Sequence, residues 1–131
     1  MEINIKQKVS NEVLENIFVT ALEGGSNYWY FLPPSTVKKV REVVSKTEEE
    51  CLSIALFKAV IEKGISIPIY DLEEPEELLG IISLNTIEAR LQKMVDDGNE
   101  RHLLNELDEN GDGDSSDAIF QYLVMNEIVF G

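Results

Sequence analysis

The chain has 131 residues, a hydrophobic fraction of 44% and a formal net charge of −14 at pH 7. This hydrophobic fraction is sufficient for a folded core and excludes a disordered polypeptide, and no apolar run reaches the length of about 18 residues that a membrane-spanning helix needs. The charge is uneven, because residues 1–70 carry nine acids and eight bases, whereas residues 71–131 carry 16 acids and three bases. So acidic a half repels phosphate backbones, and we expect no direct nucleic-acid binding. The acidic half is either only a solvated surface or an attractive site for a basic protein surface.

The length suits a single domain over residues 1–131, since neither internal repeats nor a linker-like composition divides the chain. The N-terminus lacks the continuous apolar region of a signal peptide. Cys51 is the single cysteine, and it lies in an apolar helical pattern, which favours a reduced core residue over a catalytic nucleophile. We therefore expect a cytoplasmic protein.

The first half of the chain alternates strand and helix patterns. In order, we expect a strand over 2–9, a helix over 10–23, a strand over 28–32, a helix over 37–45 and a helix over 51–61. Ser10 or Asn11 is a suitable cap for the first helix. Thr47 and Glu50 have the spacing of a capping box. The helix that this box would open is apolar nearly all round, so we place it at the centre of the fold, with Gly64 at its end.

The second half continues the same mixture. In order, we expect an edge strand over 65–70, a short strand at 81–82, a helix between Asn85 and Gly98, a short helix near 103–107, a last helix after 116 and a final strand over 127–130. Asn85 is the expected cap of the long helix, and Ser115 or Ser116 that of the last one. The sequence thus predicts an α+β fold in which about six helices pack on a small mixed sheet.

Residues 23–30 form an unusual corner between the first helix and the aromatic strand. They include the only Trp, two of the four Tyr and a Gly-Gly pair. Gly24 directly follows an apolar helical stripe, and we expect it to end the helix in a left-handed conformation, which glycine adopts without steric cost. Gly25 would then allow the chain to reverse into the strand.

Two segments carry a family resemblance. Residues 20–29 read Thr-Ala-Leu-Glu-Gly-Gly-Ser-Asn-Tyr-Trp, and Asp117-x-x-x-Gln121 precedes the tail Met-Asn-Glu-Ile-Val-Phe-Gly at 125–131. They resemble the TAxEGGxxYW motif and the DxxxQ…FGExVYG-like C-terminus of small uncharacterised proteins of bacteriophages and bacterial mobile elements. This chain departs from that tail with Met125-Asn126 in place of Phe-Gly and with Phe130 in place of Tyr. The resemblance covers a minority of the chain and implies relatives of that kind without implying an activity.

We expect the two motif segments to form one site. Its candidate binding residues are Glu23, Gly24, Gly25, Asn27, Tyr28, Trp29, Asp117, Gln121 and Glu127. Strands over 28–32 and 128–130 each need a neighbour, because an isolated strand leaves backbone groups unpaired, and we predict that they share one sheet. Gln121 interrupts an apolar helix face, and Glu23 lies at the negative end of a helix, where a carboxylate is disfavoured. Either these two side chains tie the corner to the last helix, or they line a ligand pocket beside Trp29.

No metal or cofactor site is expected. Residues 108–114 resemble the first half of a calcium-binding EF-hand loop, but Ser115 and Ile119 occupy the eighth and twelfth positions, where an aliphatic residue and a bidentate Glu belong. We therefore expect weak calcium binding at most. His102 is the only histidine, and no second ligand of zinc-site spacing accompanies it.

These observations predict a small acidic binding or interaction protein, and the resemblance implies one of phage or mobile-element type. Its expected partner is a host protein with a basic surface or a small metabolite. Two alternatives stay open: a small enzyme that uses the Glu23 and Asp117 carboxylates as acid and base, and a structural homo-oligomer with exposed aromatic residues at its interface.

Overall fold

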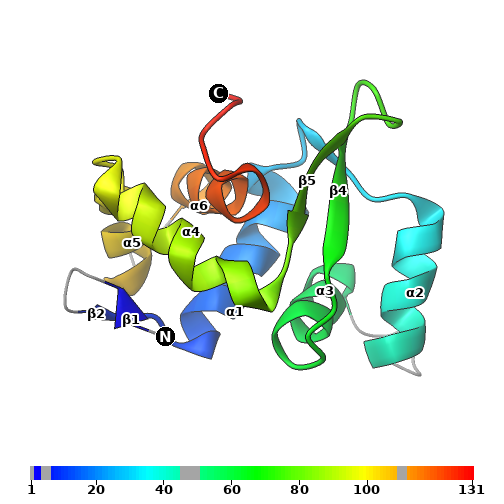
Figure 1. Cartoon of the computed structure of the whole chain (residues 1–131), viewed down its shortest axis with the longest axis horizontal. Coiled ribbons are helices and arrows are strands. Elements are labelled where there is room, and N and C mark those ends of the chain that lie inside the picture. Colours follow the sequence, from blue (N-terminus) through cyan, green and yellow to red (C-terminus); the bar gives the residue numbers. More distant parts are fainter. Residues whose placement is uncertain (1, 4–6, 45–50, 109–111) are drawn as a thin grey trace.

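The computed structural model describes residues 2–3, 7–44, 51–108 and 112–131, and within them it shows an α+β arrangement of helices around a small sheet (Figure 1). The elements, in chain order, are β1 (Glu2–Ile3), β2 (Gln7–Lys8), α1 (Asn11–Thr20), the π-helix η1 (Ala21–Gly25), β3 (Tyr30–Phe31), α2 (Pro34–Val44), α3 (Leu52–Ile61), β4 (Ile67–Asp71), β5 (Leu78–Ile82), α4 (Leu84–Asp96), α5 (Glu100–Leu107) and α6 (Gly113–Met125). Six α-helices lie in the described ranges, and the predicted α+β class is confirmed. No helix in these ranges is long and apolar enough to cross a membrane.

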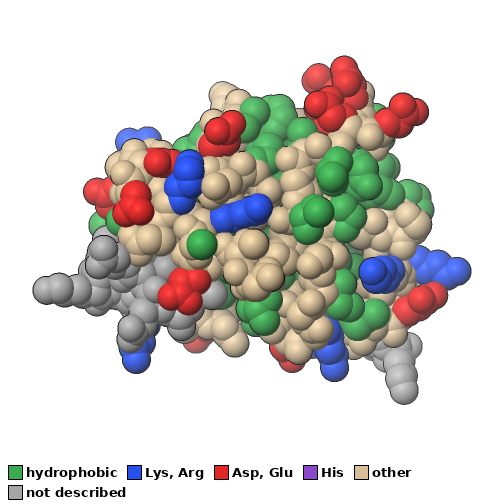
Figure 2. All heavy atoms as spheres, in the orientation of Figure 1, with side chains coloured by type: hydrophobic (Ala, Val, Ile, Leu, Met, Phe, Trp, Pro, Cys, Tyr) green, Lys and Arg blue, Asp and Glu red, His purple; other side chains and the backbone are tan. Residues whose placement is uncertain are grey.

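The main sheet is antiparallel and has the order β3-β4-β5. The expectation of a mixed sheet is wrong, because β3 with β4 and β4 with β5 both pair antiparallel. The loop between β4 and β5 is too short for the crossover that a parallel pair needs, and its acidic side chains gather at one end of the molecule (Figure 2). Residues 2–9 also differ from the prediction of one strand, since β1 and β2 pair with each other in a separate antiparallel sheet. Residues 127–130 lie in no strand, so the predicted final strand is wrong.

The central element is α6, and it packs against α1, α4, α5, η1 and β5 (Figure 1). Each of its residues from Ser115 to Val124 is buried. The sequence predicts the apolar helix over 51–61 at the centre, and this prediction is wrong, because α6 occupies that place. The burial of α6 is hard to predict from its sequence, because four of its buried side chains are polar. These groups need hydrogen-bond partners in the interior, and the partners come from other segments of the chain. The four polar residues are Ser115, Ser116, Asp117 and Gln121.

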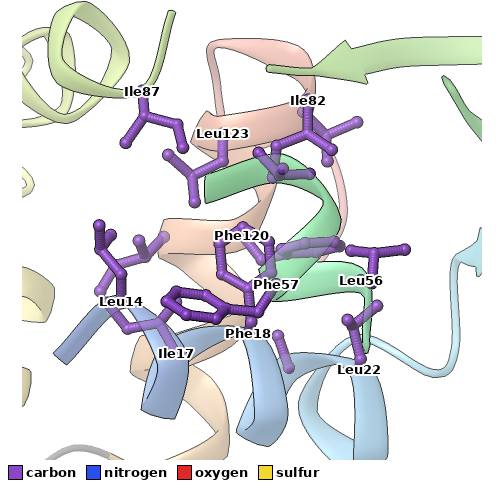
Figure 3. Close-up of a cluster of buried hydrophobic side chains, with 14 of the residues drawn as sticks. Leu14, Ile17, Phe18, Leu22, Leu56, Phe57, Ile82, Ile87, Phe120 and Leu123 are labelled. Carbon is purple, nitrogen blue, oxygen red and sulfur yellow. The ribbon is translucent and has the colours of Figure 1, made fainter. Parts of the chain in front are cut away.

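One hydrophobic core joins α6 to its neighbours. Figure 3 shows side chains from α1, η1, α3, α4 and β5 around Phe120 and Leu123 of α6. Phe18 makes edge-on ring contacts with Phe57, at a centroid distance of 5.5 Å, and with Phe120 at 6.1 Å. Cys51 is outside this core, because α3 begins at Leu52 and leaves Cys51 exposed at its N-cap. The predicted buried cysteine is therefore wrong, while the capping box at 47–50 lies outside the described residues.

Close backbone approaches fix α6 against the sheet. A Cβ atom on Gly80 of β5 would lie 2.0 Å from the carbonyl oxygen of Val124, so only glycine allows this contact. Arg90 of α4 donates from Nη1 to the carbonyl oxygens of Leu123 and Val124, at 2.5 and 2.9 Å, and to that of Ile81 at 3.0 Å. One guanidinium thus satisfies unpaired carbonyls at the end of α6 and on the edge of β5.

The helix ends agree with the prediction at some positions and differ at others. Gly64 and Gly98 adopt positive φ angles of 67° and 84°, as expected after α3 and α4, and Asn126 ends α6 with φ 64°. Ser10 caps α1, and its Oγ accepts from the Val13 amide at 3.2 Å.

Two expected caps are wrong. Ser83, not Asn85, is the N-cap residue of α4. Asp112 is the N-cap of α6, and its carboxylate accepts from the Ser115 amide at 2.9 Å. Ser115 therefore uses its backbone amide in this cap, while its side chain faces α5.

Candidate functional site

The corner of the two glycines continues α1 as a π-helix. The Ser26 amide donates to the Ala21 carbonyl at 2.8 Å, five residues back, and the Tyr30 hydroxyl donates to the Leu22 carbonyl at 2.6 Å. Gly24 has no positive φ angle, so the predicted left-handed helix end is wrong. The wider π-turn reverses the chain without such a residue, and π-helical turns are frequent at functional sites.

Gly25 is needed for a close crossing of two helices. A Cβ atom on Gly25 would lie 2.5 Å from the carbonyl oxygen of Gly113, the first residue of α6. A Cβ atom on Gly24 would meet nothing within 4 Å, and nothing in the structure explains this glycine. The pair Gly25 and Gly113 therefore brings the corner directly onto the start of the central helix.

The corner and α6 meet at the Asp117 carboxylate, which is 8% exposed. Its Oδ1 accepts from Ser26 Oγ and from Trp29 Nε1, both at 2.7 Å. Its Oδ2 accepts from the Tyr28 hydroxyl at 2.5 Å and from Gln121 Nε2 at 3.2 Å. A carboxylate has about four lone-pair positions, so all of them are occupied by groups of the protein itself.

Gln121, one turn further along α6, holds the C-terminal tail, residues 127–131. Besides its bond to Asp117, Nε2 donates to the Phe130 carbonyl at 3.1 Å. Oε1 accepts from the amides of Val129 and Phe130, at 2.8 and 2.9 Å. An amide side chain has two donors and two acceptor positions, and Gln121 uses all four. It therefore has no group left for Glu23, and the proposed tie between these two residues is wrong.

The tail covers the buried tryptophan by ring stacking. Trp29 is 1% exposed, and its ring lies parallel to that of Phe130, with centroids 5.5 Å apart and an interplanar angle of 12°. The predicted shared sheet does not form, because β3 pairs with β4 instead, where Tyr30 faces Asp71. The two motif segments are adjacent as expected, but side chains rather than a strand ladder join them.

Not all candidate residues take part in this contact. Tyr28, Trp29, Asp117 and Gln121 belong to one hydrogen-bonded group, which we call the Asp117 cluster together with Ser26. Glu23, Gly24 and Asn27 of the corner are exposed, and so is Glu127 after α6. Their role as binding residues stays a prediction. Sequence reasoning missed Ser26, although its place inside the motif and between glycine and aromatic residues was a usable signal.

Tyr28 is the member of the cluster that reaches solvent. The side chain is 49% exposed, while its hydroxyl donates to Asp117. Partial burial of the phenol, together with the Asp117 hydrogen bond and charge, raises the pKa of Tyr28 to about 12. The hydroxyl therefore stays protonated at neutral pH, and the bond to Asp117 fixes the orientation of the half-exposed ring.

A shallow surface depression of about 710 Å³ lies beside this ring. Two carboxylates line it, Glu23 from η1 and Asp114 from the first turn of α6, and none of its lining residues that the structure describes is Lys, Arg or His. Three of its lining residues are glycines, which contribute no side chain. The lining residues are Val19, Thr20, Glu23, Gly24, Gly25, Tyr28, Gly113 and Asp114.

His102 belongs to a different surface, at the contact of α5 with α6. Its Nδ1 lies 3.2 Å from Ser115 Oγ, and burial and the Arg101 charge lower the pKa of the imidazole. The hydroxyl of Ser115 is buried and also receives a bond from Asn105 at 3.3 Å, which makes it a packing contact and not an exposed nucleophile. In the parts of the chain that the structure describes, no three His, Cys, Asp or Glu side chains are grouped as a metal site would require. The EF-hand-like stretch lies partly outside those parts.

Comparison of the chain with family models, with curated proteins and with solved structures found no match in any of the three.

Proposed function

We propose that the protein is an acidic interaction protein, of the phage or mobile-element kind that its motifs resemble, and that it holds a Lys or Arg side chain of a basic partner protein in the depression beside Tyr28. The observation that carries this proposal is the combination of two carboxylates with a fixed, half-exposed aromatic ring at the corner motif. A guanidinium or ammonium group would lie over the ring and between Glu23 and Asp114.

The chemistry of the depression favours a cation over other ligands. Its charged groups are both anionic, and a cation over a tyrosine ring at an exposed site gains about 0.5–1 kcal/mol. Each exposed ion pair adds about 0.2–1 kcal/mol, so one basic side chain binds weakly. A protein partner, which adds further contacts, is therefore a better fit than a free amino acid, and the acidic half of the chain would accelerate its approach.

The Asp117 cluster argues for binding rather than catalysis. A general base needs a free lone pair, and the four hydrogen bonds to Asp117 occupy its lone pairs. Glu23 is exposed, whereas Asp117 is 8% exposed. One carboxylate thus faces solvent while the other is buried and fully bonded. This arrangement supports a binding function over an enzyme that uses Glu23 and Asp117 as acid and base.

The test is a titration of the ¹⁵N-labelled protein with a tetra-arginine peptide at physiological salt. We expect saturable amide shifts centred on residues 19–28 and 113–114. The double variant Glu23→Gln/Asp114→Asn should bind about three- to tenfold more weakly. The matched control, Glu88→Gln/Asp96→Asn on the exposed side of α4, changes the net charge equally and should bind almost as the parent does. Equal weakening by both variants would show that only the overall charge attracts the peptide, and the proposed site would be wrong.

A further inference from the structure

A second, smaller cavity lies next to Glu23, where η1, β3 and the start of α3 meet. Its volume is about 100 Å³. Leucines form its apolar wall, and three side chains contribute oxygen atoms. The lining residues are Leu22, Glu23, Tyr30, Leu32, Leu52 and Ser53. Among the described residues, Glu23 alone lines both this cavity and the depression beside Tyr28.

Ser53 is the unusual member of this lining. The side chain is 3% exposed, and its Oγ has no hydrogen-bond partner among the described residues. A buried hydroxyl without a partner costs about 1–3 kcal/mol, and such groups are rare in folded proteins. The other buried residues of α3 are apolar, and alanine at this position would pack without this cost. The unpaired Ser53 hydroxyl therefore indicates that a bound ligand supplies its missing hydrogen bond.

The oxygen atoms that line the cavity can accept hydrogen bonds from a donor group of a ligand. Tyr30 gives its hydroxyl proton to the Leu22 carbonyl, which leaves only lone pairs on its oxygen. Glu23 and Tyr30 both line the cavity, and burial together with the Glu23 charge raises the pKa of the Tyr30 phenol. Glu23 itself can only accept when ionised, and Ser53 can accept as well as donate. Of these lining residues, Glu23 is exposed to solvent, whereas Ser53 is buried.

We propose that this cavity is a binding site for a small primary alkylammonium group, whose three N–H donors are shared among the oxygens of Glu23, Tyr30 and Ser53 while its alkyl chain contacts the leucines. The volume equals the share of about three water molecules, which suits a chain of two to four carbons. This site shares Glu23 with the proposed partner site beside Tyr28, but it needs neither Tyr28 nor Asp114.

The probe is n-propylammonium chloride, titrated into the ¹⁵N-labelled protein at constant ionic strength set with NaCl. For so few heavy atoms we expect a dissociation constant of about a millimolar, with saturable shifts at residues 22, 30, 52 and 53. Affinity should rise about three- to fourfold per methylene from methyl- to propylammonium and fall once the chain exceeds the cavity. Tetramethylammonium, which has the charge without donors, and 1-propanol, which lacks the charge, should bind far more weakly.

Two variants test the oxygens separately. Glu23→Gln should weaken propylammonium binding about tenfold or more, because a charged hydrogen-bond partner is lost, whereas Glu12→Gln on the exposed face of α1 should not. Ser53→Ala should weaken binding about two- to tenfold without lowering the thermal midpoint, since it removes an unpaired hydroxyl; Ser66→Ala, an exposed serine, is its control. Tyr28→Leu should leave binding unchanged.

Three results would overturn the proposal. Absence of saturable shifts at these residues would mean that water alone fills the cavity. Equal binding of 1-propanol would mean an apolar cavity without selectivity for cations. A lower midpoint of Ser53→Ala with unchanged binding would assign the hydroxyl a structural role. None of these results bears on tetra-arginine binding beside Tyr28, so the two proposals fail separately.

Discussion

Removal of the Asp117 carboxylate tests whether the Asp117 cluster holds the corner on α6. In Asp117→Ala, Ser26 Oγ and Trp29 Nε1 lose their acceptor while they are 0% and 1% exposed. Each buried donor left unpaired costs about 1–3 kcal/mol, so these two together cost about 2–6 kcal/mol. The Tyr28 hydroxyl adds little, because the half-exposed side chain can bond to water instead. Since a domain of this kind is stable by about 5–15 kcal/mol, the variant should lose a large part of its stability.

Asp117→Asn separates charge from shape. The remaining carbonyl oxygen can still accept from Ser26 and Trp29, while the new NH₂ group faces the Tyr28 hydroxyl and the Gln121 amide, which are both donors toward Asp117. We expect a smaller loss of about 1–3 kcal/mol. Urea denaturation, monitored by tryptophan fluorescence, measures the free energy of unfolding of both variants, because Trp29 is the only tryptophan and lies in the cluster. Glu88→Gln, an exposed change on α4, should stay within about 0.5 kcal/mol.

The outcome that would refute this reasoning is a loss below about 1 kcal/mol for Asp117→Ala with an unchanged denaturant slope. It would mean that water replaces the carboxylate at Ser26 and Trp29, and that the corner does not depend on α6. A reduced slope would instead indicate that the variant has changed the compactness of the native or unfolded state, and hydrogen exchange at residues 21–30 would then locate the change.

Three further predictions concern the same region. Gly25→Ala should destabilise the protein by more than about 1 kcal/mol, because its Cβ would overlap the α6 backbone, whereas Gly24→Ala should be neutral or slightly stabilising; equal midpoints in thermal unfolding would contradict the close crossing. Tyr28 should titrate near pH 12 by ultraviolet absorbance, and its contribution to stability, complete below pH 10, should be lost as the pH rises through 12, since the folded state keeps a proton that the unfolded chain releases. Titration near pH 10 would mean that its bond to Asp117 does not form in solution. Gln121→Met should cost about 1–3 kcal/mol and increase hydrogen exchange at residues 129 and 130, and unchanged exchange there would show that other contacts hold the tail.

The sequence determined much of the secondary structure, because local chemistry decides it. Gly64 and Gly98 end their helices in left-handed conformations, and Asn126 does the same for α6, since these residues tolerate positive φ. Pro68 favoured an edge strand over 65–70, and this prediction is wrong, because β4 lies between β3 and β5. The short β3 pairs only with Tyr70 and Asp71 of β4, so the proline lies outside that ladder. Gln121 interrupts an apolar helix face, which predicts a hydrogen-bond partner if it is buried, and its buried amide bonds to Asp117 and to the tail.

The partners of these residues could not be predicted, because they come from segments far away in the chain. Ser26 and Asp117 are 91 positions apart. The place of Ser26 inside the motif marks it as a candidate, but it does not indicate which distant side chain the hydroxyl bonds. The same limit explains why the wrong helix was placed at the centre. Hydrophobicity measures the transfer of a side chain alone, whereas α6 buries polar groups that pair with the corner, with α5 and with the tail.

The corner at residues 23–30 shows most clearly which features the sequence determines and which depend on the tertiary structure. From its composition alone, the Gly-Gly pair indicated a chain reversal, and the reversal occurs. Which glycine matters, and why, depends on the crossing with Gly113, because a Cβ on Gly25 meets the backbone of a helix that begins 88 residues later. Likewise the sequence marked Glu23 as a carboxylate at an unfavourable helix end, but only the tertiary structure places it at the rim of one depression and of a cavity with the unpaired Ser53 hydroxyl. Local conformational preferences are properties of neighbouring residues, whereas cavities and buried hydrogen bonds exist only after distant segments have packed.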